Sequence, residues 1–188
     1  MNKWPTSAFT AQPKNNKCRL IVTLQCNRNC HYCYNKHDSI KQVWRDVMLD
    51  EVVGKYDTYV ITGGEPLMIK QLDRTLHVLE QLQSGGESKI YMYTSICSLH
   101  LPDIMPLIDG ITYSVHYNMD AHDLSMFKRF QTYAEFYDEH SFYLNIDSGV
   151  DTPLPIIPSV WTRIQSFKPL TSCPVPEGED LFRLVEVF

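Results

Sequence analysis

At 188 residues the chain is long enough for one domain of ordinary size with a complete hydrophobic core. Its hydrophobic share of 44% is typical of a globular protein, and its net charge of -5 arises from charges of both signs scattered along the sequence. Because no block of lysines and arginines stands out, nothing in the sequence indicates a nucleic-acid partner.

The chain begins with a polar stretch, residues 1–17, that contains two prolines and lacks the apolar centre of a signal peptide. We expect it to be an irregular lead-in to a single domain, residues 18–188. No apolar run approaches the roughly 18 residues of a membrane-spanning helix, so no membrane partner is expected. Six cysteines would permit a disulfide framework in a secreted chain, but the missing signal and the metal-like clustering of three of them favour a reducing, cytoplasmic location. Cys18, Cys97 and Cys173 are interpreted as ordinary thiols.

The first predicted strand, residues 20–24, leads directly into three cysteines. Cys26, Cys30 and Cys33 lie within eight residues, on the loop that leaves the carboxyl end of this strand. Three thiolates leave a metal centre one ligand short. On a four-iron, four-sulfur (4Fe-4S) cluster they leave one iron open to another ligand, and an open coordination position is typical of catalytic sites.

Two other interpretations of this loop remain open. The three cysteines could belong to a structural zinc site whose fourth ligand is distant in sequence, such as His31, Cys18 or Cys97. They could also be reduced cysteines that are grouped by chance.

Strands and helices are predicted to alternate along the rest of the chain. The first part contains helices at 46–56, 69–82 and 101–108, and strands at 58–62, 89–94 and 111–116. A long helix at 120–140 follows, whose aromatic residues recur at helical spacing and are expected in the core: Phe127, Phe130, Tyr133, Phe136 and Tyr137. The last part contains strands at 142–146 and 160–167, an extended proline-rich connection at 152–158, and an added strand at 181–188.

This alternation predicts an α/β fold with a parallel sheet and right-handed crossovers. Six strand–helix units are fewer than the eight of a closed barrel. We therefore expect a partial TIM barrel of the (β/α)6 kind, with a trimmed C-terminal half.

A second motif follows the strand at 58–62. Gly63, Gly64, Glu65 and Pro66 lie at its carboxyl end, the edge where parallel α/β folds bind ligands. The glycines are expected to let a ligand approach the backbone closely. Glu65 can accept a hydrogen bond from an ammonium group, and Pro66 stiffens the exit of the loop.

Together the two motifs resemble those of the radical S-adenosylmethionine (SAM) superfamily. The cysteine spacing with an aromatic residue before the last cysteine matches Cys26, Cys30, Tyr32 and Cys33, and the Gly-Gly-Glu-Pro motif matches residues 63–66. The resemblance implies that the three cysteines bind a 4Fe-4S cluster whose fourth iron chelates SAM. The reduced cluster would cleave SAM to a 5′-deoxyadenosyl radical, which takes a hydrogen atom from the substrate.

The resemblance also assigns further cofactor-binding residues. Glu65 and the backbone at Gly63 and Gly64 would hold the methionine amino group of SAM. Candidates for its carboxylate are Thr94 and Ser95, candidates for its ribose are Ser114 and His116, and Tyr32 would lie at the adenine. An electron donor such as flavodoxin or ferredoxin is implied as a partner.

Within this superfamily, the sequence matches a small single-domain member. No second cysteine cluster is present, and the short chain and Cys33-Tyr34-Asn35 are similar to the glycyl-radical activases. A polypeptide substrate is therefore slightly preferred over a small nucleotide-like metabolite. The alternative of another class is a non-catalytic iron–sulfur or zinc binding module.

Overall fold

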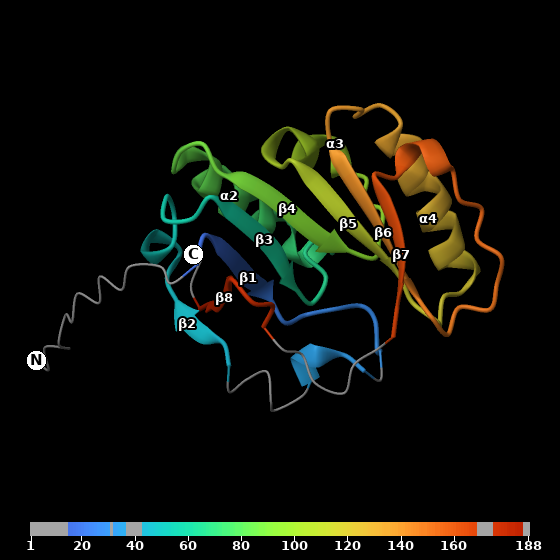
Figure 1. The fold of residues 1–188 in the computed structure, drawn as a ribbon, viewed down its shortest axis with the longest axis horizontal. Coiled ribbons are helices and arrows are strands. Elements are labelled where there is room, and N and C mark those ends of the chain that lie inside the picture. The colour runs from blue at the N-terminus through green and yellow to red at the C-terminus, as the bar shows by residue number, and fades with distance from the viewer. Residues whose placement is uncertain (1–14, 31, 37–42, 169–174, 186–188) are drawn as a thin grey trace, which may run out of the picture.

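A computed structural model describes residues 15–30, 32–36, 43–168 and 175–185 (Figure 1). Most of the predicted lead-in, His31 and Cys173 lie outside these residues. The strands are β1 (Lys17–Thr23), β2 (Arg45–Val47), β3 (Thr58–Gly63), β4 (Lys89–Thr94), β5 (Gly110–Val115), β6 (Ser141–Asp147), β7 (Arg163–Phe167) and β8 (Glu179–Leu184). The α-helices are α2 (Leu72–Ser84), α3 (Leu101–Ile104) and α4 (Ala121–Ala134).

All strands of the described residues pair in parallel in one open sheet of order β2-β8-β1-β3-β4-β5-β6-β7. The predicted α/β fold, a partial barrel, is therefore confirmed. The strands expected near residues 20, 59, 91, 112, 144 and 163 are neighbours in this order. The added strand of the tail lies between β1 and a further strand, β2, which the sequence pattern did not indicate.

The helix predicted for residues 46–56 is wrong. Arg45–Val47 forms β2, and a short 3₁₀ turn at Leu49–Glu51 follows it. Val47 and Val52 are buried and Val53 is half-buried, but Val47 reaches the core by pairing with Leu184 of β8. An available sheet edge outweighed the local helix preference.

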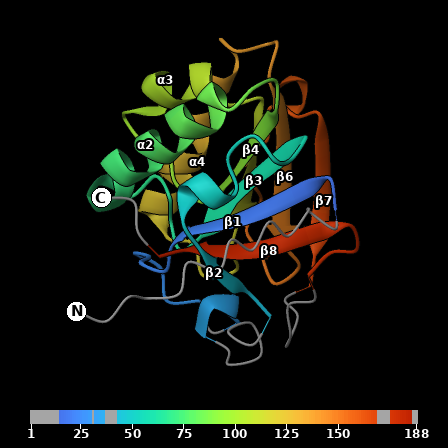
Figure 2. The same cartoon turned by 90° about the vertical axis from the view of Figure 1, so that its left-hand side faces the viewer.

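The helices α2, α3 and α4 cover one face of the sheet (Figure 2). Phe127 and Phe130 of α4 are fully buried there and stack on Trp161 at 6.0 and 5.8 Å between ring centroids. The helix ends at Ala134, well before the predicted His140. Phe136 follows this end and is 78% exposed, so its expected place in the core is wrong.

The proline-rich connection is extended, as predicted, and Gln131 of α4 holds it in place. The buried side chain of Gln131 donates to the carbonyl of Pro155 and accepts from the backbone of Ile157 and from the indole of Trp161, at 2.7–3.0 Å. These bonds satisfy the backbone of a segment that has no sheet partners.

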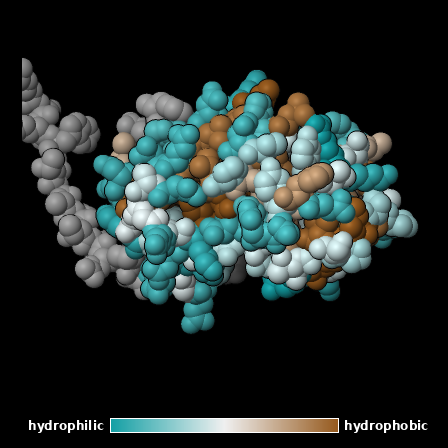
Figure 3. Space-filling view, turned by 90° about the horizontal axis from the view of Figure 1, so that it is seen from above, coloured by the Kyte–Doolittle hydropathy of each residue, from teal (hydrophilic) through white to brown (hydrophobic). Residues whose placement is uncertain are grey.

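Seen from above, the surface is largely hydrophilic, with hydrophobic residues in separate areas (Figure 3). Among the described residues, no helix has both the length and the apolar character needed to cross a membrane.

Candidate active site

The loops at the carboxyl edge of the sheet enclose a cavity of about 390 Å³. The loop after β1 runs along this edge (Figure 1). Eleven of the twelve predicted site residues line the cavity, namely Cys26, Cys30, Tyr32, Cys33, Gly63, Gly64, Glu65, Thr94, Ser95, Ser114 and His116. Pro66 is buried beside it and accepts a hydrogen bond from Thr75 through its carbonyl. The structure thus brings the two motifs together, while the ligands of these residues stay a prediction.

The three clustered cysteines lie on one wall of the cavity. Cys30 is buried, Cys33 half-buried and Cys26 exposed, and all three are free thiols. The backbone N–H of Cys33 donates to the carbonyl of Cys30 at 3.2 Å, which closes a tight turn between them. Burial raises the pKa of the Cys30 thiol.

Two of the fourth ligands suggested for a structural zinc site lie away from the cysteine loop. Cys18 and Cys97 belong to the hydrophobic core and do not line the cavity, and His31 lies outside the described residues. Within the described part of the chain, no three cysteine, histidine or acidic side chains are close enough to bind one metal ion.

Gly63 and Gly64 also have a structural role. A Cβ at Gly63 would lie 2.2 Å from the carbonyl oxygen of Thr23, and one at Gly64 would lie 1.9 Å from that of Gln25. Those same oxygens accept hydrogen bonds from Gly64 N at 2.7 Å and Glu65 N at 2.9 Å. The missing side chains therefore let the Gly-Gly-Glu-Pro loop bind the segment that leads into the cysteine loop.

Glu65 is the buried acid of the cavity, 1% exposed. Its carboxylate accepts from the hydroxyl of Thr94 at 2.7 Å, the backbone and hydroxyl of Ser95 at 2.9 and 3.1 Å, and the backbone of Leu67 at 3.1 Å. Burial raises the pKa of Glu65, and these donors oppose the rise. Thr94 and Ser95, which were expected to touch a ligand, both fix this carboxylate.

Arg28 is a site residue that the sequence analysis did not single out. It lies between the clustered cysteines, and its guanidinium binds both carboxylate oxygens of Asp123 at 2.6 and 3.0 Å. It also donates to the hydroxyl and carbonyl of Ser95 at 2.9 and 3.2 Å. Arg28 thus ties the cysteine loop to the first turn of α4 and, through Ser95, to Glu65.

We expect Arg28→Gln to lower the free energy of unfolding by about 2 kcal/mol, because it leaves the largely buried Asp123 carboxylate without its charged partner. Denaturant unfolding measures this loss. The matched control is Arg183→Gln, which removes a similar bidentate pair with Asp46 at a more exposed position and should cost less than about 1 kcal/mol. Equal losses in the two variants would contradict a structural role for Arg28.

Tyr32, His116 and Asp147 form a second buried polar group at the cavity. The hydroxyl of Tyr32 lies 2.5 Å from Nδ1 of His116 and is also hydrogen-bonded to Asp147. Since a carboxylate only accepts, the tyrosine donates to Asp147 and His116 donates to the tyrosine. Burial lowers the pKa of His116 to about 4, so this histidine is neutral at neutral pH. The aromatic ring of Tyr32 is thereby held in a fixed orientation.

The cavity also has apolar side chains, some of which come from the other end of the chain. Ile21, Phe167, Val175 and Leu181 line it, and the sequence motifs gave no sign of them. Their positions follow from the topology, because β8 pairs with β1. The cavity therefore combines a thiol wall, a buried acid and apolar side chains.

A comparison with characterised proteins gives one partial match. The chain is 37% identical over 78 residues to a GTP 3′,8-cyclase of Staphylococcus saprophyticus, a radical SAM enzyme. The match covers 35% of this chain and 23% of the relative. No family model and no solved structure matches the chain. The match indicates a distant relationship to radical SAM enzymes.

Proposed function

We propose that this chain is a radical SAM enzyme. The observation that carries the proposal is the cavity at the carboxyl edge of the sheet, which three clustered cysteines and the buried Glu65 line together. The distant match to a radical SAM enzyme supports the same function.

The donor set fits the two cofactors. Cys26, Cys30 and Cys33 would bind three irons of a 4Fe-4S cluster, and Glu65 would face the ammonium group of SAM with a fixed negative charge. Reductive cleavage of SAM at the cluster supplies a radical that abstracts hydrogen. The protein orients the cofactors through the rigid Glu65 and Tyr32 groups, and the apolar side chains of the cavity exclude water.

The substrate was expected from the sequence to be a polypeptide, with a small nucleotide-like molecule as the alternative. The relative's name gives GTP as its substrate, which supports the alternative. The size of the cavity, about 390 Å³, also suits a cofactor and part of a small molecule.

The cofactor assignment is tested by anaerobic reconstitution followed by iron, sulfide and zinc analysis and by electron paramagnetic resonance. We expect about four irons and four sulfides per chain, and a spectrum of the reduced cluster that changes when SAM is added. Stoichiometric zinc without sulfide would support the zinc-module alternative. A cluster whose electron paramagnetic resonance spectrum does not change when SAM is added would support the non-catalytic iron–sulfur alternative.

For Glu65→Gln we expect SAM to bind roughly ten- to a hundred-fold more weakly while the iron content stays unchanged, because one charge-assisted interaction is lost. Calorimetric titration of SAM into the reconstituted protein measures the change. Glu80→Gln, on the exposed side of α2, is the control for charge alone. Equal SAM affinity in the wild type and in Glu65→Gln would show that Glu65 does not bind SAM.

A further inference from the structure

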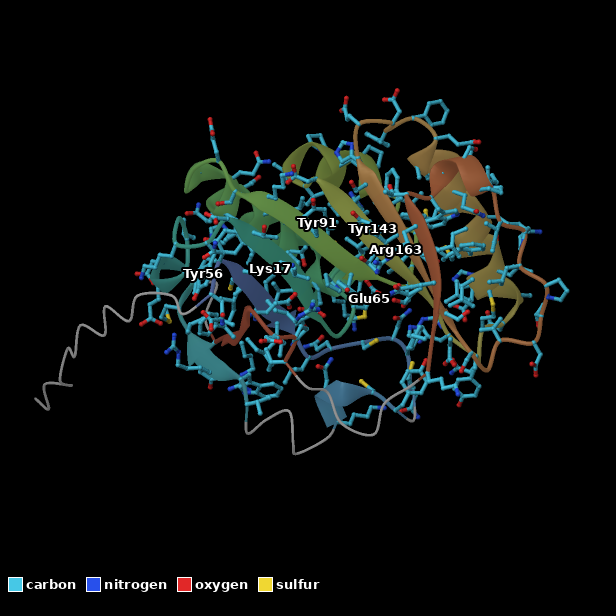
Figure 4. All side chains as sticks on the ribbon, viewed as in Figure 1. Lys17, Tyr56, Glu65, Tyr91, Tyr143 and Arg163 are labelled. Carbon is cyan, nitrogen blue, oxygen red and sulfur yellow. The ribbon has the colours of Figure 1, made fainter. Side chains whose placement is uncertain are left out.

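A second cavity, of about 410 Å³, lies on the sheet face that the α-helices leave open. Tyr91, Tyr143 and Arg163 stand close together on this face, with Lys17 farther along the sheet (Figure 4). The described lining residues come from seven strands and include a single aliphatic side chain, Val60.

The polar lining follows from the strand register. Tyr93, Thr112, Tyr143 and Arg163 are successive register partners across β4, β5, β6 and β7, so they form one row on the same face. Parallel sheets are usually covered on both faces by apolar packing. A row of hydroxyl and guanidinium groups at these positions instead indicates a surface that binds a polar ligand.

The charge of this cavity is opposite to that of the chain. Lys17, Arg19, Lys89 and Arg163 line it together with one acid, Glu179, whereas the whole chain has a net charge of -5. Glu179 pairs with Arg19 at 2.8 Å and with Lys17 at 3.7 Å. No carboxylate in the described ranges lies within ion-pair distance of Lys89 or Arg163. The lining therefore keeps an excess of positive charge.

Two arginines are held against tyrosine rings at the cavity. Arg19 lies over Tyr93 at 5.2 Å, and Arg163 lies over Tyr143 at 5.8 Å from the ring centroid. These contacts fix guanidinium groups whose donors match the oxygens of a phosphate. A phosphate monoester carries nearly two negative charges, so it balances the positive excess better than a single carboxylate does.

The two cavities are neighbours. Arg19, Tyr93 and Asn145 line both of them. Ser114, in the first cavity, follows Thr112, in the second, by two residues of the same strand, which is about 7 Å. A single small molecule can therefore place one end beside the cysteine loop and the other among the cations.

From this geometry we infer that the second cavity binds the phosphate of a phosphorylated small-molecule substrate, whose reacting carbon lies in the first cavity. The inference rests on the proposed radical SAM function and specifies its substrate class. It favours the small-molecule alternative over a polypeptide.

The test is calorimetric titration of ribose 5-phosphate, ribonate and ribose into the reconstituted protein. Ribose 5-phosphate should bind at least ten-fold more tightly than ribonate, and ribose should not bind measurably. Arg163→Gln should weaken the phosphate ester about ten-fold and Lys89→Gln several-fold, while Arg163→Lys should retain part of the affinity. The control Lys128→Gln, on the exposed side of α4, should leave the affinity unchanged within two-fold.

The inference would be overturned if ribose 5-phosphate did not bind or bound no more tightly than ribonate. It would also be overturned if its affinity were unchanged in both Arg163→Gln and Lys89→Gln. Arg163 and Lys89 are exposed, and circular dichroism checks that their variants stay folded. SAM cleavage, measured on the same preparation, separates the two proposals. If SAM is cleaved but ribose 5-phosphate does not bind, the phosphate-site inference is wrong and the radical SAM proposal stands. If ribose 5-phosphate binds but SAM is not cleaved, the radical SAM proposal is wrong and the phosphate site stands.

Discussion

Cys30→Ala should abolish the iron–sulfur cluster. Two thiolates on the cysteine loop cannot hold a cubane whose fourth iron has no protein ligand. Cys30 is also the most buried of the three clustered cysteines, which leaves little room for a solvent ligand in its place. After anaerobic reconstitution we expect less than about a tenth of the wild-type iron and sulfide, and loss of the visible absorption of the cluster.

The control for this experiment is Cys97→Ala. Cys97 is equally a buried thiol, but it packs in the hydrophobic core and does not line the cavity. Its replacement should lower the stability modestly and leave iron and sulfide at wild-type levels. If Cys97→Ala lost the cluster while Cys30→Ala kept it, the assignment of the cysteine loop would be wrong.

Gly64→Ala should disrupt the site without removing any ligand. The added methyl group would lie 1.9 Å from the carbonyl oxygen of Gln25, so the two loops must move apart. We expect a loss of about 3 kcal/mol in the free energy of unfolding. Because the displaced segment leads directly to Cys26, cluster loading should fall as well, which iron analysis on the folded fraction measures.

Gly86→Ala separates these two effects. Gly86 has a φ of 129°, so an alanine there has a strained backbone. Because nothing lies within 4 Å of an added Cβ, the methyl group makes no steric clash. It should cost about 1–3 kcal/mol and leave cluster loading unchanged, because it lies at the far end of α2. Loss of iron in both variants would show that Gly64 acts through stability alone.

Most of the fold follows from local sequence patterns. Short β-branched and apolar runs predicted β1, β3, β4, β5 and β6, and helical spacing predicted α2. The apolar residues of these segments recur with the period of the strand or helix that they form, so the local sequence shows which residues are buried. The stretch at 46–56 was misassigned because its burial depends on β8, which is more than a hundred residues away in the sequence. Such a tertiary contact leaves no local signal.

The site was predictable to a similar degree. Motifs that are continuous in sequence placed Cys26, Cys30, Cys33 and Glu65 correctly at one edge. Arg28 was missed because its partner Asp123 is distant in sequence and only the folded chain pairs them. The basic cavity was missed for the same reason, because its cations come from β1, β4 and β7 and form no charged run.

The central claim is tested most directly by the fate of SAM. The anaerobically reconstituted protein is reduced with dithionite, incubated with SAM, and assayed for 5′-deoxyadenosine and methionine, with Cys30→Ala as the matched control. We predict that the wild type forms both products in equal amounts and that Cys30→Ala forms neither. A wild-type protein that holds a full, reduced cluster and binds SAM, yet forms no 5′-deoxyadenosine, would contradict the account.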